Sequence, residues 1–305
     1  MLVRAFLPRA LPLYLSFKTY STMASAVPPQ SFHLDRSIWN DTLYTHIRDF
    51  WYTGLPVGQK YGNEVTARRW WGAGRSQEEG LQIDAECKEA YSAALQSIGP
   101  DKIALSPWHS YADDLVHAKD IAAPFIEEVK TAQSKDSQKA ADTALSLIIL
   151  LDQIPRNIHR DPAGLRLIYN HYDRIVWSLL RSLPTLTPIP ISHESFRAAP
   201  PYKSWFSLPL MHAEDLESHR LGWKLLRELR EECEQEGDQA LINDTGASFN
   251  AAKSHWEIIE RFGRYPHRNE CLGRESTAEE REWLKTGDTF GVKQEQQEND
   301  GKEEL

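Results

Sequence analysis

Cysteine is scarce in this sequence: Cys87, Cys233 and Cys271 are widely spaced, odd in number and form no C-x-x-C pair. This pattern fits neither a disulfide framework nor a zinc-ribbon site, and it favours a reducing compartment. Nucleotide-binding loops are also absent, because no G-x-x-x-x-G-K-S/T motif occurs and the G-A-G run at 72–74 lacks the rest of its motif. The sequence therefore lacks the marks of a phosphate-loop enzyme or a dinucleotide-binding enzyme.

Long hydrophobic runs are absent too. The longest, at 145–151 with one serine inside it, is far below the roughly 20 residues that span a bilayer. Positive charge is in deficit, since 35 lysines and arginines stand against 44 aspartates and glutamates, a net charge of −9. A surface of this sign disfavours nucleic acid and anionic membranes. We therefore predict no nucleic-acid partner and no membrane partner.

Strict alternation of polar and apolar residues, the sign of a half-buried strand, is lacking, whereas apolar spacings of three and four recur. Ser76-x-x-Glu79 resembles a capping box at the start of a long helix that stops before Pro100. Residues 140–151 are apolar on nearly every face, so we expect a central buried helix that Pro155 ends. The sequence predicts an all-α architecture without a repeat at a period of about 34 or 33 residues, although the helices can still stack in pairs.

Later helix boundaries follow the same logic. Pro162 suits a helix start, and the prolines of 184–201 predict a long connection. Gly263 suits the residue that closes a helix, and Ser276 and Thr277 offer two capping registers for the last one.

The ends differ in composition from the body. Residues 1–34 contain three basic residues and no acidic one, which is typical of a mitochondrial transit peptide or a disordered leader. Translation from Met23 would remove those basic residues and leave the protein in the cytoplasm. Residues 287–305 are acidic and nearly free of apolar side chains, so we expect a disordered tail. The body, 35–286, is predicted to be a single helical domain.

Two segments place an arginine and an asparagine after a helix, in surroundings apolar enough to suggest burial. One follows Pro155 and the other follows Pro266. Arginine matches carboxylate and phosphate geometry in a bidentate way, and asparagine both donates and accepts. We therefore predict that the two corners converge on one anion-binding pocket. The residues expected to bind the substrate are Asp152, Arg156, Asn157, Arg160, Arg264, Arg268, Asn269 and Arg274.

Proton transfer is expected from His212, Glu214 and His267, since imidazole titrates near neutral pH and an apolar pocket raises a carboxyl pKa toward it. A metal site would need His255 or His267 beside His212-x-Glu214, without the H-E-x-x-H spacing, so we predict no metal. No motif identifies a cofactor. The structural alternative is that each arginine pairs with a nearby acid and holds a helix junction together.

Ten tryptophans are present, and most are expected to anchor the core. The adjacent pair Trp70-Trp71 could instead wall a cleft.

Four segments carry a resemblance to a known family. They are Phe50-Trp51, Leu150-Leu151-Asp152-Gln153 with Pro155-Arg156-Asn157, Leu208-Pro209-Leu210-Met211-His212-x-Glu214, and Arg261-Phe262-Gly263-Arg264-Tyr265-Pro266-His267-Arg268-Asn269 with Leu272-Gly273-Arg274. Over roughly residues 40 to 285 the sequence resembles the family catalogued as domain of unknown function 924. The resemblance implies an all-helical, tetratricopeptide-like array of antiparallel helices and no reaction. The chain departs from the family pattern at 161–165 and at His219, where glutamine is common.

Two functions follow as hypotheses. The first is an enzyme that acts on a small anionic substrate by hydrolysis or group transfer, because clusters of ionisable groups mark sites. The alternative is a tetratricopeptide-like module that binds a peptide or protein without catalysis, since such arrays usually serve recognition. The expected partner is accordingly a small anionic molecule or a peptide.

Overall fold

The structure, a computed structural model, describes residues 32–56, 58–292 and 294. Within these residues every regular element is a helix, which confirms the all-α prediction. Most of the expected leader and the tail beyond 294 lie outside the described residues. The α-helices are α1 (Asp41–Trp51), α2 (Glu64–Trp71), α3 (Gln77–Gln96), α4 (Tyr111–Gln133), α5 (Ser137–Ile148), α6 (Ile154–Ile158), α7 (Pro162–Leu167), α8 (Asp173–Ser182), α9 (Pro200–Lys203), α10 (Leu208–Met211), α11 (Leu216–Glu236), α12 (Gln239–Phe262) and α13 (Ala278–Leu284).

Two long helical rods each contain one π turn. The turn η1 (Ile149–Gln153) joins α5 to α6, and η2 (Ile168–Tyr172) joins α7 to α8. The prediction that Pro155 ends the central helix is therefore wrong. In η1 the Ile154 N–H bonds the Ile149 carbonyl five residues back, and Pro155 falls in the first turn of α6, where its missing N–H is tolerated. π turns of this kind often mark functional sites.

The first rod is the core of the fold. Residues 144–151 are almost completely buried, because α1, α4, α8 and the turn η6 (Ser204–Ser207) pack around them. An ion pair inside this core joins α4 to α8, with Arg174 donating to both oxygens of Asp114 at 2.7 Å. Both side chains are nearly fully buried, so the pair fixes how the two helices meet.

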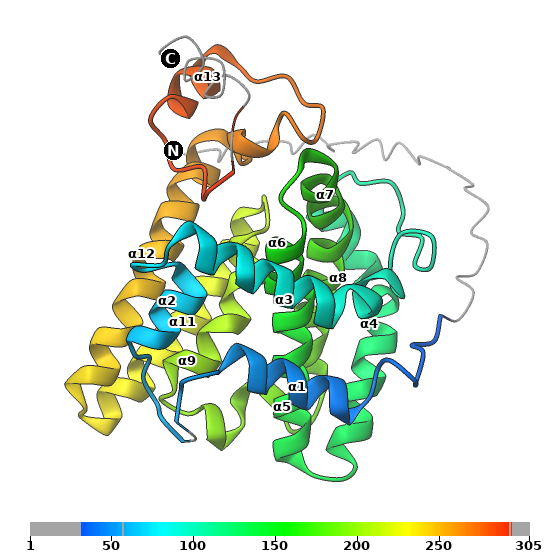
Figure 1. The fold of residues 1–305 in the computed structure, drawn as a ribbon, viewed down its shortest axis with the longest axis vertical. Helices are drawn as coiled ribbons and strands as arrows, with labels where there is room; N and C mark the ends of the chain where they lie inside the picture. Colours follow the sequence, from blue (N-terminus) through cyan, green and yellow to red (C-terminus); the bar gives the residue numbers. More distant parts are fainter. Residues whose placement is uncertain (1–31, 57, 293, 295–305) are drawn as a thin grey trace, which may run out of the picture. The chain divides into compact units, whose positions relative to one another are not determined.

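Helices α11 and α12 lie side by side, and α3 lies against α6 (Figure 1). A repeat array is not shown by these pairings. None of the helices in the described part of the chain combines the length and hydropathy needed to cross a membrane.

Local capping signals define several boundaries. Ser76 and Glu79 form the expected capping box of α3, and Thr277 with Glu280 forms that of α13. Gly263 adopts a left-handed conformation with φ of 68° and closes α12, as predicted. The proline-rich connection after α8 consists mostly of short turns: η3 (Leu183–Thr185), η4 (Pro190–Ser192), η5 (Glu194–Phe196), α9 and η6.

Candidate functional site

A connected set of polar and aromatic side chains lies where the two π-turn rods meet the start of α11, the end of α12 and the loop that follows it. We call it the arginine–histidine cluster. Its members are Asp152, Arg156, Tyr169, Asp173, His212, Glu214, His219, His255, Tyr265, His267, Arg268 and Arg274.

One chain of contacts in the cluster begins at His212, just after α10. Its Nδ1 lies 2.8 Å from Oδ1 of Asp152, which is on η1 and almost completely buried. Arg156 lies 3.6 Å from the same oxygen and forms a bidentate pair with Asp173 at 2.8 and 2.9 Å. The π turn thus presents Asp152 to a histidine and Arg156 to a second carboxylate.

The protonation states of this pair follow from its surroundings. Burial alone would raise the pKa of Asp152, but His212 and Arg156 outweigh it and hold the pKa at about 2. Burial, assisted by Arg156, lowers the pKa of His212 below 6.5 despite Asp152. At neutral pH the pair is a carboxylate and a neutral imidazole. Because the carboxylate accepts the Nδ1–H, the lone pair of this histidine is on Nε2.

Glu214 is held by the loop after α12. Arg274 donates to both of its oxygens at 2.6 and 2.8 Å, and the Tyr265 N–H donates at 2.7 Å. Burial would raise the pKa of Glu214, but the hydrogen bonds from Arg274 and the charge of Arg268 lower it overall. Glu214 is therefore a charged group whose oxygens are already engaged.

Arg268 differs from the other two arginines of the cluster, because it packs on aromatic rings and forms no ion pair with a described residue. Its guanidinium carbon lies 4.2 Å from the ring centroid of Tyr169 and 4.5 Å from that of Tyr265. The residue is 5% exposed, and its Nε is fully buried without a hydrogen-bond partner across 32–56, 58–292 and 294, where the guanidinium also forms no ion pair. Burying a polar atom without a partner costs free energy, so this nitrogen distinguishes Arg268 from the paired arginines of the cluster.

The buried histidines around Arg268 are neutral. Burial lowers the pKa of His255 to about 3 and that of His219 to about 4, and it lowers that of His267 well below 6.5 with help from Arg268. Phe290 stacks on His255, with centroids 4.1 Å apart. This contact comes from the start of the segment expected to be a tail, so that part of 287–305 packs on the domain.

The predicted substrate-binding residues fall into two groups. Arg156, Arg268, Arg274 and Asp152 join the cluster. Tyr169, which stacks on Arg268, and Asp173, which binds Arg156, are four residues apart on one rod and so bring the two corners together.

The other four predicted residues have partners elsewhere. Asn157 and Arg160 both bind Asp84 of α3, and Arg264 forms a bidentate pair with Glu280 of α13. Asn269 donates to Ser276. These contacts hold helix junctions together, as the structural alternative expects.

The sequence reasoning missed Tyr169, Asp173 and Tyr265. Asp173 and Arg174 are two adjacent charges between Tyr172 and Ile175 in a largely apolar stretch, and that pair is the signal that could have drawn attention to Asp173. The two tyrosines carry no such signal, because an aromatic ring on an inward face is ordinary core.

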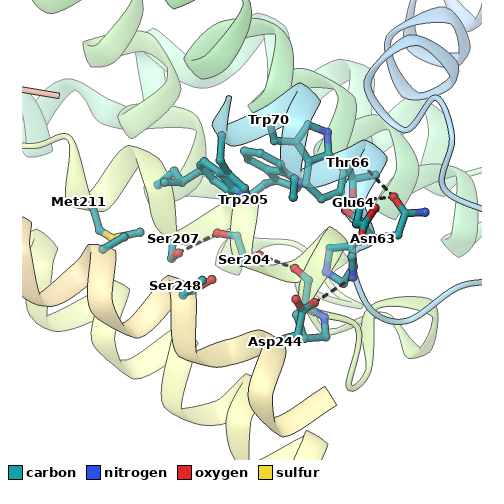
Figure 2. A pocket seen from close by; sticks show the side chains of 18 residues that line it. Asn63, Glu64, Thr66, Trp70, Ser204, Trp205, Ser207, Met211, Asp244 and Ser248 are labelled. Carbon is teal, nitrogen blue, oxygen red and sulfur yellow. Dashed lines mark hydrogen bonds between the residues drawn. The ribbon is translucent and has the colours of Figure 1, made fainter. Parts of the chain in front are cut away.

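A cavity of about 660 Å³ lies beside the cluster, between α2, α9, η6, α10 and α12. We call it the tryptophan cavity, because Trp70, Trp71 and Trp205 line it. Figure 2 shows Trp70 and Trp205 near one another, with Asp244 and Ser248 of α12 across the cavity. The pair Trp70-Trp71 thus lines a hollow, the possibility that the sequence left open beside a core role.

The cavity and the cluster share a wall. Met211 and Ala251 line the cavity, and their carbonyls accept hydrogen bonds from the cluster: the Tyr265 hydroxyl donates to Met211, and Nδ1 of His255 donates to Ala251 at 2.8 Å.

Among the described residues, no group of three or more histidines, cysteines, aspartates or glutamates is arranged to hold a metal ion. The side chains with the chemistry to hold a ligand are instead the guanidinium of Arg268 and the neutral imidazoles beside it.

These features define an all-helical protein in which a buried network of arginines, histidines and carboxylates adjoins an aromatic cavity. The chain belongs to the family described as bacterial protein of unknown function (DUF924), which matches residues 47–288. A solved structure, that of a protein of unknown function, ATU0120, from Agrobacterium tumefaciens, is 24% identical, with a TM-score of 0.29. That similarity covers 68% of this chain and 98% of the other. The search of curated proteins found no match.

Proposed function

We propose that the arginine–histidine cluster is the active site of an enzyme that acts on a small anionic substrate. The observation that carries this proposal is Arg268, a buried guanidinium stacked between two tyrosines and lacking a polar partner in the described chain. A carboxylate or phosphate of the substrate would supply the hydrogen bonds that this group lacks.

The pairing of charges in the cluster, rather than its net charge, supports an anion at this position. Its three guanidinium groups match three carboxylates in number, but the carboxylates are already engaged. Asp173 binds Arg156, Glu214 binds Arg274, and Asp152 binds His212. Arg268 is left as the cation to which an incoming anion can bind.

His212 is the general base in this proposal. Its Nε2 lone pair removes a proton from water in hydrolysis, or from a hydroxyl in group transfer, and Asp152 stabilises the imidazolium that forms. His267 is a second neutral imidazole next to Arg268, and its buried Nδ1 has no partner among the described residues, so it is suited to contact the substrate or exchange a proton with it. Glu214 acts as a positioning residue, because Arg274 and the Tyr265 N–H occupy its oxygens.

Thermal-shift titration with inorganic phosphate and with succinate tests the proposal. An anion at about 100 times its Kd stabilises the folded state by about 2.7 kcal/mol, and this shift should disappear in Arg268→Met. The matched control is Arg160→Met, which removes an equal charge from an exposed arginine that pairs with Asp84 and should keep the shift. Equal anion stabilisation in wild type and Arg268→Met, or none in either, contradicts the proposal.

The alternative, a tetratricopeptide-like module that binds a peptide, is favoured by one surface feature. A groove of about 280 Å³ on α11 and α12 is lined by Arg220, Trp223, Arg227 and Trp256. Peptide binding that survives Arg268→Met and is lost in Trp223→Ala would support this alternative over the enzyme.

A further inference from the structure

The tryptophan cavity differs from the cluster in having space and little polar lining. Its volume of about 660 Å³ falls in the range of small-molecule sites. The wall comprises Trp70, Trp71 and Trp205, with hydroxyl groups of Ser204, Ser207 and Ser248 elsewhere on the surface (Figure 2).

The indoles of the lining pack on one another. Trp71 stacks on Trp205 with centroids 5.2 Å apart and ring planes 17° from parallel, whereas Trp70 stands perpendicular to Trp205. Trp71 nevertheless remains 59% exposed, which is unusual for so large an apolar ring. The faces of tryptophan rings attract cations more strongly than those of tyrosine or phenylalanine.

The charged residues of the lining have one sign. They are Glu64 and Asp244, and neither forms an ion pair with any residue that the structure describes. Among the residues that the structure describes, no lysine or arginine lines the cavity. Asp244 accepts one hydrogen bond, from the Gly62 N–H at 3.1 Å, so its second oxygen is available to a ligand.

The start of α2 also faces the cavity and brings partial positive charge. A helix end is equivalent to about half a charge, and the capping box of Asn63 and Thr66 already satisfies part of it. Two carboxylates outweigh that half charge, so the lining remains negative. The net charge of −9 on the whole chain acts in the same direction.

We propose that the tryptophan cavity binds an organic ammonium cation, a small molecule whose charged amine carries an apolar body. The ammonium lies against the indole faces and the carboxylate of Asp244, and the apolar body fills the space toward Met211. This site is separate from the anion site at Arg268, and the inference holds whether or not the cluster is catalytic.

A matched pair of probes tests the charge requirement. Choline and 3,3-dimethylbutan-1-ol have nearly the same shape, but only choline is charged. Titration calorimetry of the full chain should show choline binding at least about fivefold more tightly than its uncharged isostere. Benzyltrimethylammonium, which fills more of the cavity, should bind more tightly than choline.

Two variants locate the binding. Trp71→Ala should weaken benzyltrimethylammonium binding about five- to thirtyfold. Asp244→Asn, which can keep the hydrogen bond from Gly62, should weaken it about tenfold and reduce the preference for choline over its isostere. The controls are Val116→Ala and Asp120→Asn, both on an exposed face of α4, and both should leave affinity unchanged.

Three results would overturn the inference. Equal affinity for choline and its isostere would show an apolar cavity without charge selection. Binding that is lost in Arg268→Met but kept in Trp71→Ala would place the ligand in the arginine–histidine cluster. Absence of heat for all three probes, with the fold intact by circular dichroism, would exclude the site. Because the anion titration uses different probes and a different variant, each proposal can fail while the other holds.

Discussion

The arginine–histidine cluster and the tryptophan cavity share a wall at Met211 and Ala251, yet their chemistry is opposite. In the cluster most polar groups are buried and bind one another, and the feature that points to a ligand is the guanidinium of Arg268, which forms no ion pair with a described residue. In the cavity the polar groups are few, and the features that point to a ligand are the open volume and the negative charge of the lining. The proposal of a ligand site can thus rest on an unpaired atom, as at Arg268, or on an open volume, as in the tryptophan cavity.

The largest expected difference between the two regions is in how much each makes the free energy of unfolding depend on pH. The cluster contains buried histidines, whereas the described residues that line the cavity include no histidine. His255 has a folded pKa of about 3 and His219 of about 4, against a usual value of 6.5. Between those values the unfolded chain binds protons that the folded chain does not, so stability rises with pH from about 4 to 6.5 and then levels off. The two histidines together contribute on the order of 7 kcal/mol between pH 4 and 6.5, because each pH unit between the folded and unfolded pKa of a histidine contributes about 1.4 kcal/mol.

Urea denaturation at a series of pH values measures this slope. His219→Gln should remove on the order of 3 kcal/mol of this change. Its amide can still donate to the Ala213 carbonyl, as Nε2 of the histidine does at 3.0 Å, so the variant should fold. His117→Gln, on an exposed face of α4, is the control and should leave the slope unchanged. The carboxylates with lowered pKa values, such as Asp152 at about 2, add slope of the same sign below about pH 5, so the comparison is read between about pH 5 and 6.5. An unchanged slope in His219→Gln would mean that this histidine is not held neutral by burial.

A second comparison is within the cluster, between two arginines of the loop that follows α12. Arg274→Met should lower the free energy of unfolding by about 3 kcal/mol, because it leaves the carboxylate of Glu214 buried with most of its hydrogen-bond donors gone. Arg268→Met should lower the free energy of unfolding by less than about 1 kcal/mol, because no acid among the described residues forms an ion pair with that guanidinium. Chemical denaturation of both variants measures the difference. If Arg268→Met is as unstable as Arg274→Met, its guanidinium has a structural role and the argument for an incoming anion fails.

Much of the fold could be predicted because its signals are local. The capping box at Ser76 and the left-handed Gly263 each depend on residues within one helical turn. The prediction that Pro155 ends the central helix was wrong because its outcome is not decided by the proline alone. Whether a proline ends a helix depends on the hydrogen-bond pattern before it, and a π turn has no sequence signature as strong as proline itself. A repeat array could be inferred from the family resemblance alone, and the helix pairings do not show it.

The site could be predicted only in part, because its contacts join distant segments. Burial and residue type drew attention to Arg156 and Arg268, and both joined the cluster. The same criteria selected Arg160 and Arg264, whose partners are Asp84 and Glu280. Sequence patterns show which arginines need an acid, but an acid 76 positions away becomes a partner only through the packing of helices. The unpaired state of Arg268 is likewise a property of the folded chain.

The smallest expected effect on stability is at Phe290, whose ring packs on the cluster at His255. No described residue covers Trp71 of the cavity in the same way, and its side chain is 59% exposed. Phe290→Ala should cost about 1 kcal/mol, the value of an aromatic pair, since its ring stacks on His255 at 4.1 Å. It should also raise the pKa of His255 from about 3 toward 6.5, because burial is the largest cause of the low value. Histidine resonances followed by NMR through a pH titration measure this, with Val116→Ala on an exposed face of α4 as the control. An unchanged pKa of His255 in Phe290→Ala would show that the protein interior alone, and not this ring, keeps water from the cluster.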